Sequence, residues 1–306
     1  MKCFVVAALV VSFTPHVGRT FRSAGPEGPT YVQGAARTIY VTVTDGKNAS
    51  VPDLTGADFT VKEDGKARTI EKAEPATTPM QIALMLDDGG LSLGAVRQGA
   101  GQFVEALQKK AYFSLITTGG RNLTAFDFTS DPRPIYDALG KLFARNSPAT
   151  YLLDGFLDVA QEFERLKAPR PVIVAVAAEG EEFSNTRAEV VLDAIRRSGT
   201  TFFYIGLGAP VTQGTKPALT ADRPGDSTEG ESAKRNTVLG SAPKNSGGRS
   251  EQVLQATGVP VVMKQYAQEL AGQYAITYRS ETPGAKLTVE TSKKGVKLRA
   301  PSRSGS

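Results

Sequence analysis

The chain has 306 residues, a formal net charge of +5, 40% hydrophobic residues and no Trp. Its one Cys and its one His, Cys3 and His16, both lie within the first sixteen positions. Beyond that stretch, the composition excludes disulfides, Cys/His zinc sites, cysteine nucleophiles and Ser-His-Asp hydrolysis, so any site must use carboxylates, hydroxyls, amides, Lys or Arg.

Residues 1–24 have the pattern of a signal peptide. Lys2 precedes the apolar run 3–13, which is too short to span a bilayer but suits the hydrophobic region of a leader. Removing residues 1–24 would also remove three positive charges and lower the net charge from +5 to +2, which favours no particular partner. We expect an exported protein, periplasmic or extracellular, with no membrane span after leader removal. A buried N-terminal strand is the alternative interpretation of the same run.

Residues 36–75 predict a small antiparallel unit. Ile39, Val41 and Val43 alternate with polar residues, which is typical of a strand with one buried face. Phe59 and Val61 begin a second alternating strand, and the Asp-Gly pair at 64–65 predicts a hairpin turn after it.

Residues 79–272 have a different pattern. Continuous apolar runs at 80–86, 112–117, 172–178 and 201–207 predict strands covered on both faces, and amphipathic helical patterns lie between them. Alternating strands and helices indicate an α/β fold with a doubly wound, mainly parallel sheet. Residues 210–250 are rich in Gly, Pro, Ser and Thr, so we expect a flexible insertion there.

Residues 273–300 return to short alternating strands. Neither this segment nor 36–75 has enough strands to be stable alone, so we predict that they pair as one small antiparallel β-domain interrupted by the α/β domain. The C-terminal tail is basic but has no aromatic residues on which bases could stack, so we expect no nucleic-acid binding.

Polar side chains follow several of the predicted strands. Asp87 and Asp88 follow the first apolar run, Thr150 precedes a helix, and Glu179 begins an acidic turn at 179–182 that we expect to be exposed. Because sites in open α/β sheets form at the carboxyl ends of the strands, these side chains are the candidate site.

Several segments resemble a known family. Residues 54–61 (LTGADFTV) and 63–66 (EDGK) are similar to the N-terminal segment of secreted bacterial proteins related to the von Willebrand factor A (VWFA) domain. Residues 246–249 (SGGR) and 266–278 (YAQELAGQYAITY) are similar to their C-terminal segment. The resemblance covers nearly the whole chain, and it implies a VWFA-like fold.

The resemblance also implies a metal-ion-dependent adhesion site (MIDAS), with the pattern Asp-x-Ser-x-Ser on one loop, Thr on a second and Asp on a third. Asp87 matches the first Asp, Thr150 the Thr, and Glu179 stands at the last Asp, whereas Gly89 and Leu91 replace the two Ser. A divalent cation such as Mg²⁺ or Ca²⁺ prefers such oxygen ligands. Because two of the five ligands are missing, a degenerate metal site and a metal-free one both remain open.

The resemblance implies a non-enzymatic protein–protein interaction or adhesion module whose protein partner the sequence does not identify. A structural envelope protein without a metal site is one alternative. The other is an Asp-based phosphotransfer domain, since an acidic pair also ends the first strand of phospho-acceptor domains. However, the segment 201–210 lacks the Lys that such a domain needs, and the leader directs the chain away from ATP.

Overall fold

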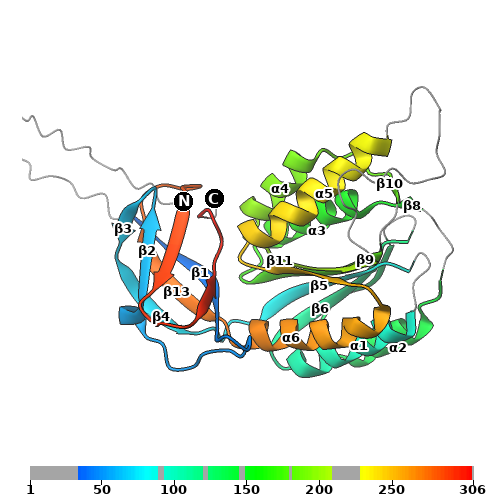
Figure 1. The fold of residues 1–306 in the computed structure, drawn as a ribbon, viewed down its shortest axis with the longest axis horizontal. Coiled ribbons are helices and arrows are strands. Elements are labelled where there is room, and N and C mark those ends of the chain that lie inside the picture. Colours follow the sequence, from blue (N-terminus) through cyan, green and yellow to red (C-terminus); the bar gives the residue numbers. More distant parts are fainter. Residues whose placement is uncertain are drawn as a thin grey trace, which may run out of the picture. The chain divides into compact units, whose positions relative to one another are not determined.

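Figure 1 shows a computed structural model, which describes residues 34–88, 93–119, 123–144, 149–178, 181–208 and 228–304. The expected leader, residues 1–24, lies outside these ranges, as do Gly89, Leu91 and Glu179. Within the described ranges, no helix is both long enough and apolar enough to cross a membrane.

A six-stranded sheet lies at the centre of the α/β part. Its strands are β5 (Met80–Leu86), β6 (Ala111–Thr117), β7 (Leu123–Thr129), β9 (Pro171–Ala178), β11 (Thr201–Leu207) and β12 (Arg249–Val253). Their order is β12-β11-β9-β5-β6-β7, and all neighbours are parallel except β7, which runs antiparallel to β6. β9 and β11 are buried on both faces, because their apolar runs leave no polar face for solvent.

Helices cover both faces of this sheet (Figure 1). One face packs against α1 (Leu93–Leu107), α2 (Arg133–Lys141) and α6 (Val259–Ala271). The other packs against α3 (Leu152–Leu166), α4 (Ala188–Arg197) and α5 (Thr228–Asn245). The predicted fold class, a doubly wound and mainly parallel α/β sheet, is therefore confirmed.

Strands from both ends of the chain form the antiparallel part. β1 (Ala35–Thr44) pairs with β13 (Tyr274–Ser280) and β15 (Lys297–Arg299), and β13 also pairs with β4 (Ile70–Pro75). β2 (Phe59–Glu63) pairs with β14 (Leu287–Thr291) and, across the hairpin turn, with β3 (Lys66–Arg68). The predicted β-domain built from N- and C-terminal segments is confirmed. The side chains of Val41, Val61 and Ile276 meet in its core.

The described part of the segment 210–250 differs from its predicted structure. We expected a flexible insertion, but residues 228–245 form α5 and residues 249–253 add β12 to the edge of the sheet. Helix α5 has almost no apolar stripe. Among its described side chains, Val238 and Ala242 are the ones buried in the hydrophobic core between the sheet and helices α3, α4 and α5. These two lie one turn apart on the same face and pack against α4, so tertiary packing forms a helix that the local sequence does not indicate. Residues 210–227 lie outside the described ranges.

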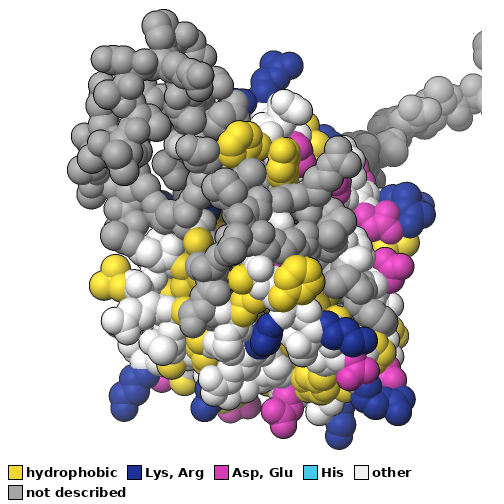
Figure 2. Space-filling model, turned by 90° about the vertical axis from the view of Figure 1, so that its right-hand side faces the viewer, with side chains coloured by type: hydrophobic (Ala, Val, Ile, Leu, Met, Phe, Trp, Pro, Cys, Tyr) yellow, Lys and Arg dark blue, Asp and Glu magenta, His cyan; other side chains and the backbone are white. Residues whose placement is uncertain are grey.

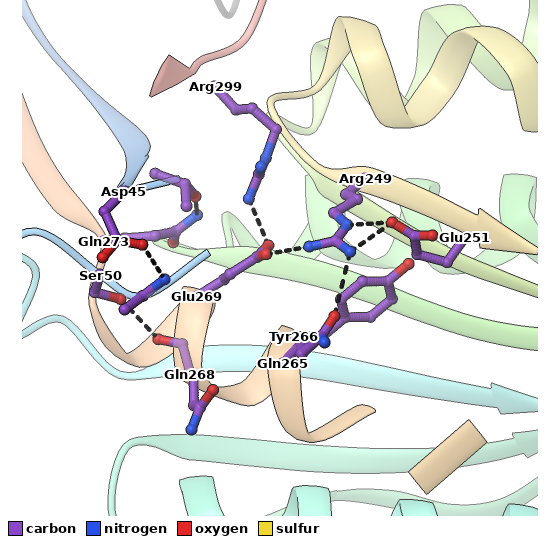
Figure 3. A network of polar contacts seen from close by, with 12 residues as sticks. Asp45, Ser50, Arg249, Glu251, Gln265, Tyr266, Gln268, Glu269, Gln273 and Arg299 are labelled. Atoms are coloured by element: carbon purple, nitrogen blue, oxygen red, sulfur yellow. Dashed lines mark hydrogen bonds and ion pairs between the residues drawn. The ribbon is translucent and has the colours of Figure 1, made fainter. Parts of the chain in front are cut away.

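A buried ionic network links α6 to strands of both sheets (Figure 3). Glu269 of α6 is fully buried and accepts hydrogen bonds from Arg249 of β12 and Arg299 of β15, at 2.5 Å each. Arg249 also lies over the ring of Tyr266, 5.6 Å from its centroid. Because a buried carboxylate is stable only when it is paired, this network fixes β15 against the α/β part.

Candidate functional site

Two adjacent carboxylates lie at the carboxyl end of β5. Asp87 and Asp88 are 3% and 2% exposed. Oδ2 of Asp87 accepts a hydrogen bond from the amide of Ala178 at 3.1 Å, at the end of β9. Oδ1 of Asp88 accepts one from the amide of Gly119 at 2.9 Å, just after β6. Because β5 lies between β9 and β6, the two side chains tie together the ends of three adjacent strands.

A short parallel ladder extends this edge. β8 (Ala149–Thr150) pairs with β10 (Glu181–Glu182), with Thr150 opposite Glu182, and Thr150 also bridges to Gly119. Thr150 is 3% exposed. The ladder therefore brings the predicted Thr150 to the strand edge where Asp88 is held.

Glu182 is buried, whereas the sequence predicts that the acidic turn 179–182 is exposed. Its side chain is 2% exposed, and its Oε1 accepts a hydrogen bond from the amide of Ser184 at 3.2 Å. Burial raises the pKa of the Glu182 carboxyl above its ordinary value. The Ser184 hydroxyl in turn accepts a hydrogen bond from the amide of Asp154 in the first turn of α3. Residues after β10 thus cap a helix whose own N-cap residue, Tyr151, supplies no side-chain cap.

Arg235 of α5 reaches the same edge. Its side chain is 6% exposed, and Nη2 donates to the carbonyl oxygen of Ala178 at 2.5 Å. Ala178 is therefore bound at its amide by Asp87 and at its carbonyl by Arg235. The sequence gives no local signal for Glu182 or Arg235 as buried groups, because charged residues are exposed by default and only tertiary contacts bury these two.

The residues predicted to hold a cation are placed as follows. Asp87 and Thr150 lie at the carboxyl edge, and Glu179 lies outside the described ranges. In the part of the chain that the structure describes, no group of three or more His, Cys, Asp or Glu side chains is arranged to hold a metal ion. One oxygen of Asp87 and one of Asp88 are already used by backbone amides. A site for Mg²⁺ or Ca²⁺ at Asp87, Thr150 and Glu179 therefore stays a prediction.

Apolar side chains are exposed beside these buried polar groups. Phe183 follows Glu182, is 45% exposed, and has its ring centroid 6.2 Å from that of Tyr151. Leu254 follows β12 and is 76% exposed. Figure 2 views the molecule from the side on which the central strands end and shows several hydrophobic side chains on that face. Large exposed apolar side chains on a fixed edge are suited to contact another protein.

No family model matches the sequence, and no curated protein matches it. Solved structures similar to the chain include proximal thread matrix protein 1 from the mussel byssus, a von Willebrand factor type A protein from Catenulispora acidiphila, and BatB from Bacteroides thetaiotaomicron. Their sequence identities to this chain are 14%, 11% and 13%, with TM-scores of 0.47, 0.45 and 0.40. The matches cover 69%, 90% and 62% of this chain and 50%, 75% and 98% of those chains.

This chain thus spans about half the length of the byssus protein, 50% by the match above. Another structure of the byssus protein, 13% identical with a TM-score of 0.43, has a zinc-occupied MIDAS motif. The similarity of this chain to all these proteins is one of fold, and no residue takes a role from them.

Proposed function

We propose that the chain is an exported, non-enzymatic VWFA-type interaction module that binds a protein partner through the carboxyl edge of its central sheet. The observation that carries this proposal is the exposed Phe183, which stands directly after the buried Glu182 on an edge whose backbone is held by side-chain hydrogen bonds.

Rigidity at this edge favours binding. Asp87, Asp88 and Ser184 each bond to the backbone of a different element, so the described strand ends and the start of α3 are held in place before a partner arrives. A contact surface that is already ordered loses less conformational entropy on association. Phe183 is then presented in a defined place, and aromatic side chains of this size often dominate binding energy at protein interfaces.

Export rests on the sequence of residues 1–24, and a structural envelope role remains the alternative. The two differ in one respect. An interaction module loses its partner when the carboxyl edge is altered, whereas a purely structural protein has no specific partner to lose.

The test compares two exposed apolar residues. Phe183→Asp and Val190→Asp change side chains that are each 45% exposed, the first at the carboxyl edge and the second on α4. We expect the full-length wild-type chain to recover a specific protein from the exported fraction, with competition by excess unlabelled chain. Phe183→Asp should lose that protein and Val190→Asp should retain it, with thermal midpoints near wild type for both. Equal capture by both variants would contradict the proposed edge, and no competed partner would favour the structural role.

A further inference from the structure

The carboxyl edge contains a positive charge that the protein itself supplies. We propose that the guanidinium of Arg235 takes the electrostatic place of a divalent cation at this edge, so that the buried carboxylates are held without a metal ion. The inference concerns the same edge as the proposed function, but it does not depend on any partner.

The position of Arg235 carries the inference. Nη2 lies 2.5 Å from the carbonyl oxygen of Ala178, and the amide of the same residue donates to Oδ2 of Asp87 at 3.1 Å. Ala178 ends β9, and Asp87 follows β5, the strand next to it. A cation bound between the ends of these two strands would therefore share its surroundings with a guanidinium that is 6% exposed.

Three carboxylates are buried at this edge. Asp87, Asp88 and Glu182 are each at most 3% exposed, and an ionised carboxylate that leaves water without compensation is strongly destabilising. Burial raises the pKa of Glu182, and the charge of Arg235 opposes that rise.

Within the described ranges, the other buried cation is Arg170, which directly precedes β9 and so lies at the opposite end of that strand from Ala178. Arg235 is accordingly the buried cation that the described part of the chain places at the carboxyl edge.

The packing of α5 explains how Arg235 reaches this place. Val238 and Ala242 follow it at spacings of three and seven residues, so all three lie on one face of the helix. Both are buried in the cluster that also contains Ala177 of β9. The packing of α5 through these residues thus places Arg235 at the end of β9.

A guanidinium and a divalent ion differ in what they can offer a partner. A metal ion can exchange a water molecule for a carboxylate of the partner. A guanidinium has five donors in a fixed plane, has no exchangeable ligand position and remains charged in proteins. The edge should therefore keep its structure and its binding surface in the presence of a chelator.

The first experiment uses the full-length wild-type chain. Calorimetric titration with Mg²⁺, Ca²⁺ and Mn²⁺ should show no saturable binding, and EDTA should leave the thermal midpoint unchanged. A saturable isotherm that Asp87→Ala abolishes would overturn the proposal, since a metal ion would then hold the position assigned to Arg235. This result does not depend on any Arg235 variant being able to fold.

The second experiment separates charge from packing. Arg235→Met keeps much of the side-chain length without the charge, Arg235→Lys keeps the charge, and Lys244→Met removes an exposed charge from the same helix as a control. We expect Arg235→Met to lower the thermal midpoint by roughly 10 °C, Arg235→Lys by clearly less, and Lys244→Met not at all. Equal losses for Met and Lys at position 235 would show that packing alone matters and would overturn the proposal. Neither experiment uses a partner, so failure here leaves the Phe183 test of the proposed function unaffected.

Discussion

The carboxylate of Asp88 accepts a hydrogen bond from the amide of Gly119, 31 residues away along the chain, at 2.9 Å. Gly119 in turn bridges to Thr150, so this contact connects the end of β5 to the β8–β10 ladder. Asp87, the preceding residue, makes the corresponding contact to Ala178 at the end of β9. Asp87, which the family resemblance assigns to metal binding, and its neighbour Asp88 thus both hold the ends of adjacent strands together.

Asp88 should therefore be needed for stability. Asp88→Ala leaves the buried amide of Gly119 without this acceptor, which costs about 1–3 kcal/mol in the free energy of unfolding. Asp88→Asn can keep the oxygen acceptor and should cost less. Urea denaturation with matched m-values would measure both. Equal losses for Ala and Asn would show that the negative charge, and not the hydrogen bond, is what the site requires.

Glu269 should be among the most sensitive positions outside the carboxyl edge. Glu269→Gln removes the fully buried negative charge that pairs with the partly buried guanidinium groups of Arg249 and Arg299, and weakens both ion pairs. A loss of about 3–5 kcal/mol in unfolding free energy is expected. Glu251 contacts the same Arg249 but is 38% exposed in its side chain, so Glu251→Gln should cost under about 1 kcal/mol. Similar losses for the two variants would argue against a central role for Glu269.

The central strands and the pairing of the chain ends could be predicted from the sequence because their signals are local. β9 and β11 are continuous apolar runs, and β1 alternates apolar and polar residues. The pairing of β1 with β13 followed from a physical requirement, since neither terminal segment has enough strands to be stable alone.

α5 and β12 could not be predicted in the same way. Residues 228–245 include Pro243 and few large apolar residues, so they lack the apolar spacing typical of a helix. The β12 sequence, RSEQV, lacks the apolar residues typical of a buried strand. At the candidate site, Asp87 and Thr150 could be selected because sites in open α/β sheets form at the carboxyl ends of the strands. Arg235 could not be selected in this way, because its contact with Ala178 joins residues 57 positions apart and depends on how α5 packs.

Gly248 offers a test of the segment 246–249, which carries part of the family resemblance. A Cβ atom at this position would lie 1.9 Å from the carbonyl oxygen of Phe202, a backbone atom that cannot move aside without shifting β11. Gly248→Ala should therefore lower the unfolding free energy by about 1–3 kcal/mol. The control is Gly240→Ala on α5, where nothing lies within 4 Å of the added atom and helix propensity should give a gain of about 0.5–1 kcal/mol. The thermal midpoints of the two variants should therefore shift in opposite directions. An unchanged midpoint for Gly248→Ala would contradict the close approach of the Gly248 and Phe202 backbones.

Stability should also depend on pH through Glu63, a fully buried carboxylate of the β-domain. Burial alone would raise its pKa, but hydrogen bonds from Ser280, the Glu281 amide, Tyr278 and Arg68 outweigh that effect and hold the pKa below its ordinary value of 4.5. An acid whose pKa is lower in the folded state stabilises the protein when pH is above the unfolded value. That contribution is lost as pH falls from about 4.5 through the lowered folded pKa.

Glu63→Gln should accordingly destabilise the protein at pH 7 by about 2–4 kcal/mol, because the pairing with Arg68 and the charged hydrogen bonds are weakened. The difference from wild type should shrink as the pH falls from about 4.5 through the lowered pKa of the folded carboxyl, because the wild-type side chain then becomes protonated as well. Glu290→Gln is the matched control, since Glu290 pairs with Lys62 in the same sheet but is 54% exposed in its side chain, and its effect should be small at every pH. Denaturant unfolding at a series of pH values measures all three proteins. A Glu63→Gln deficit that stays constant from pH 7 to pH 3 would mean that shape, and not ionisation, explains the role of this residue.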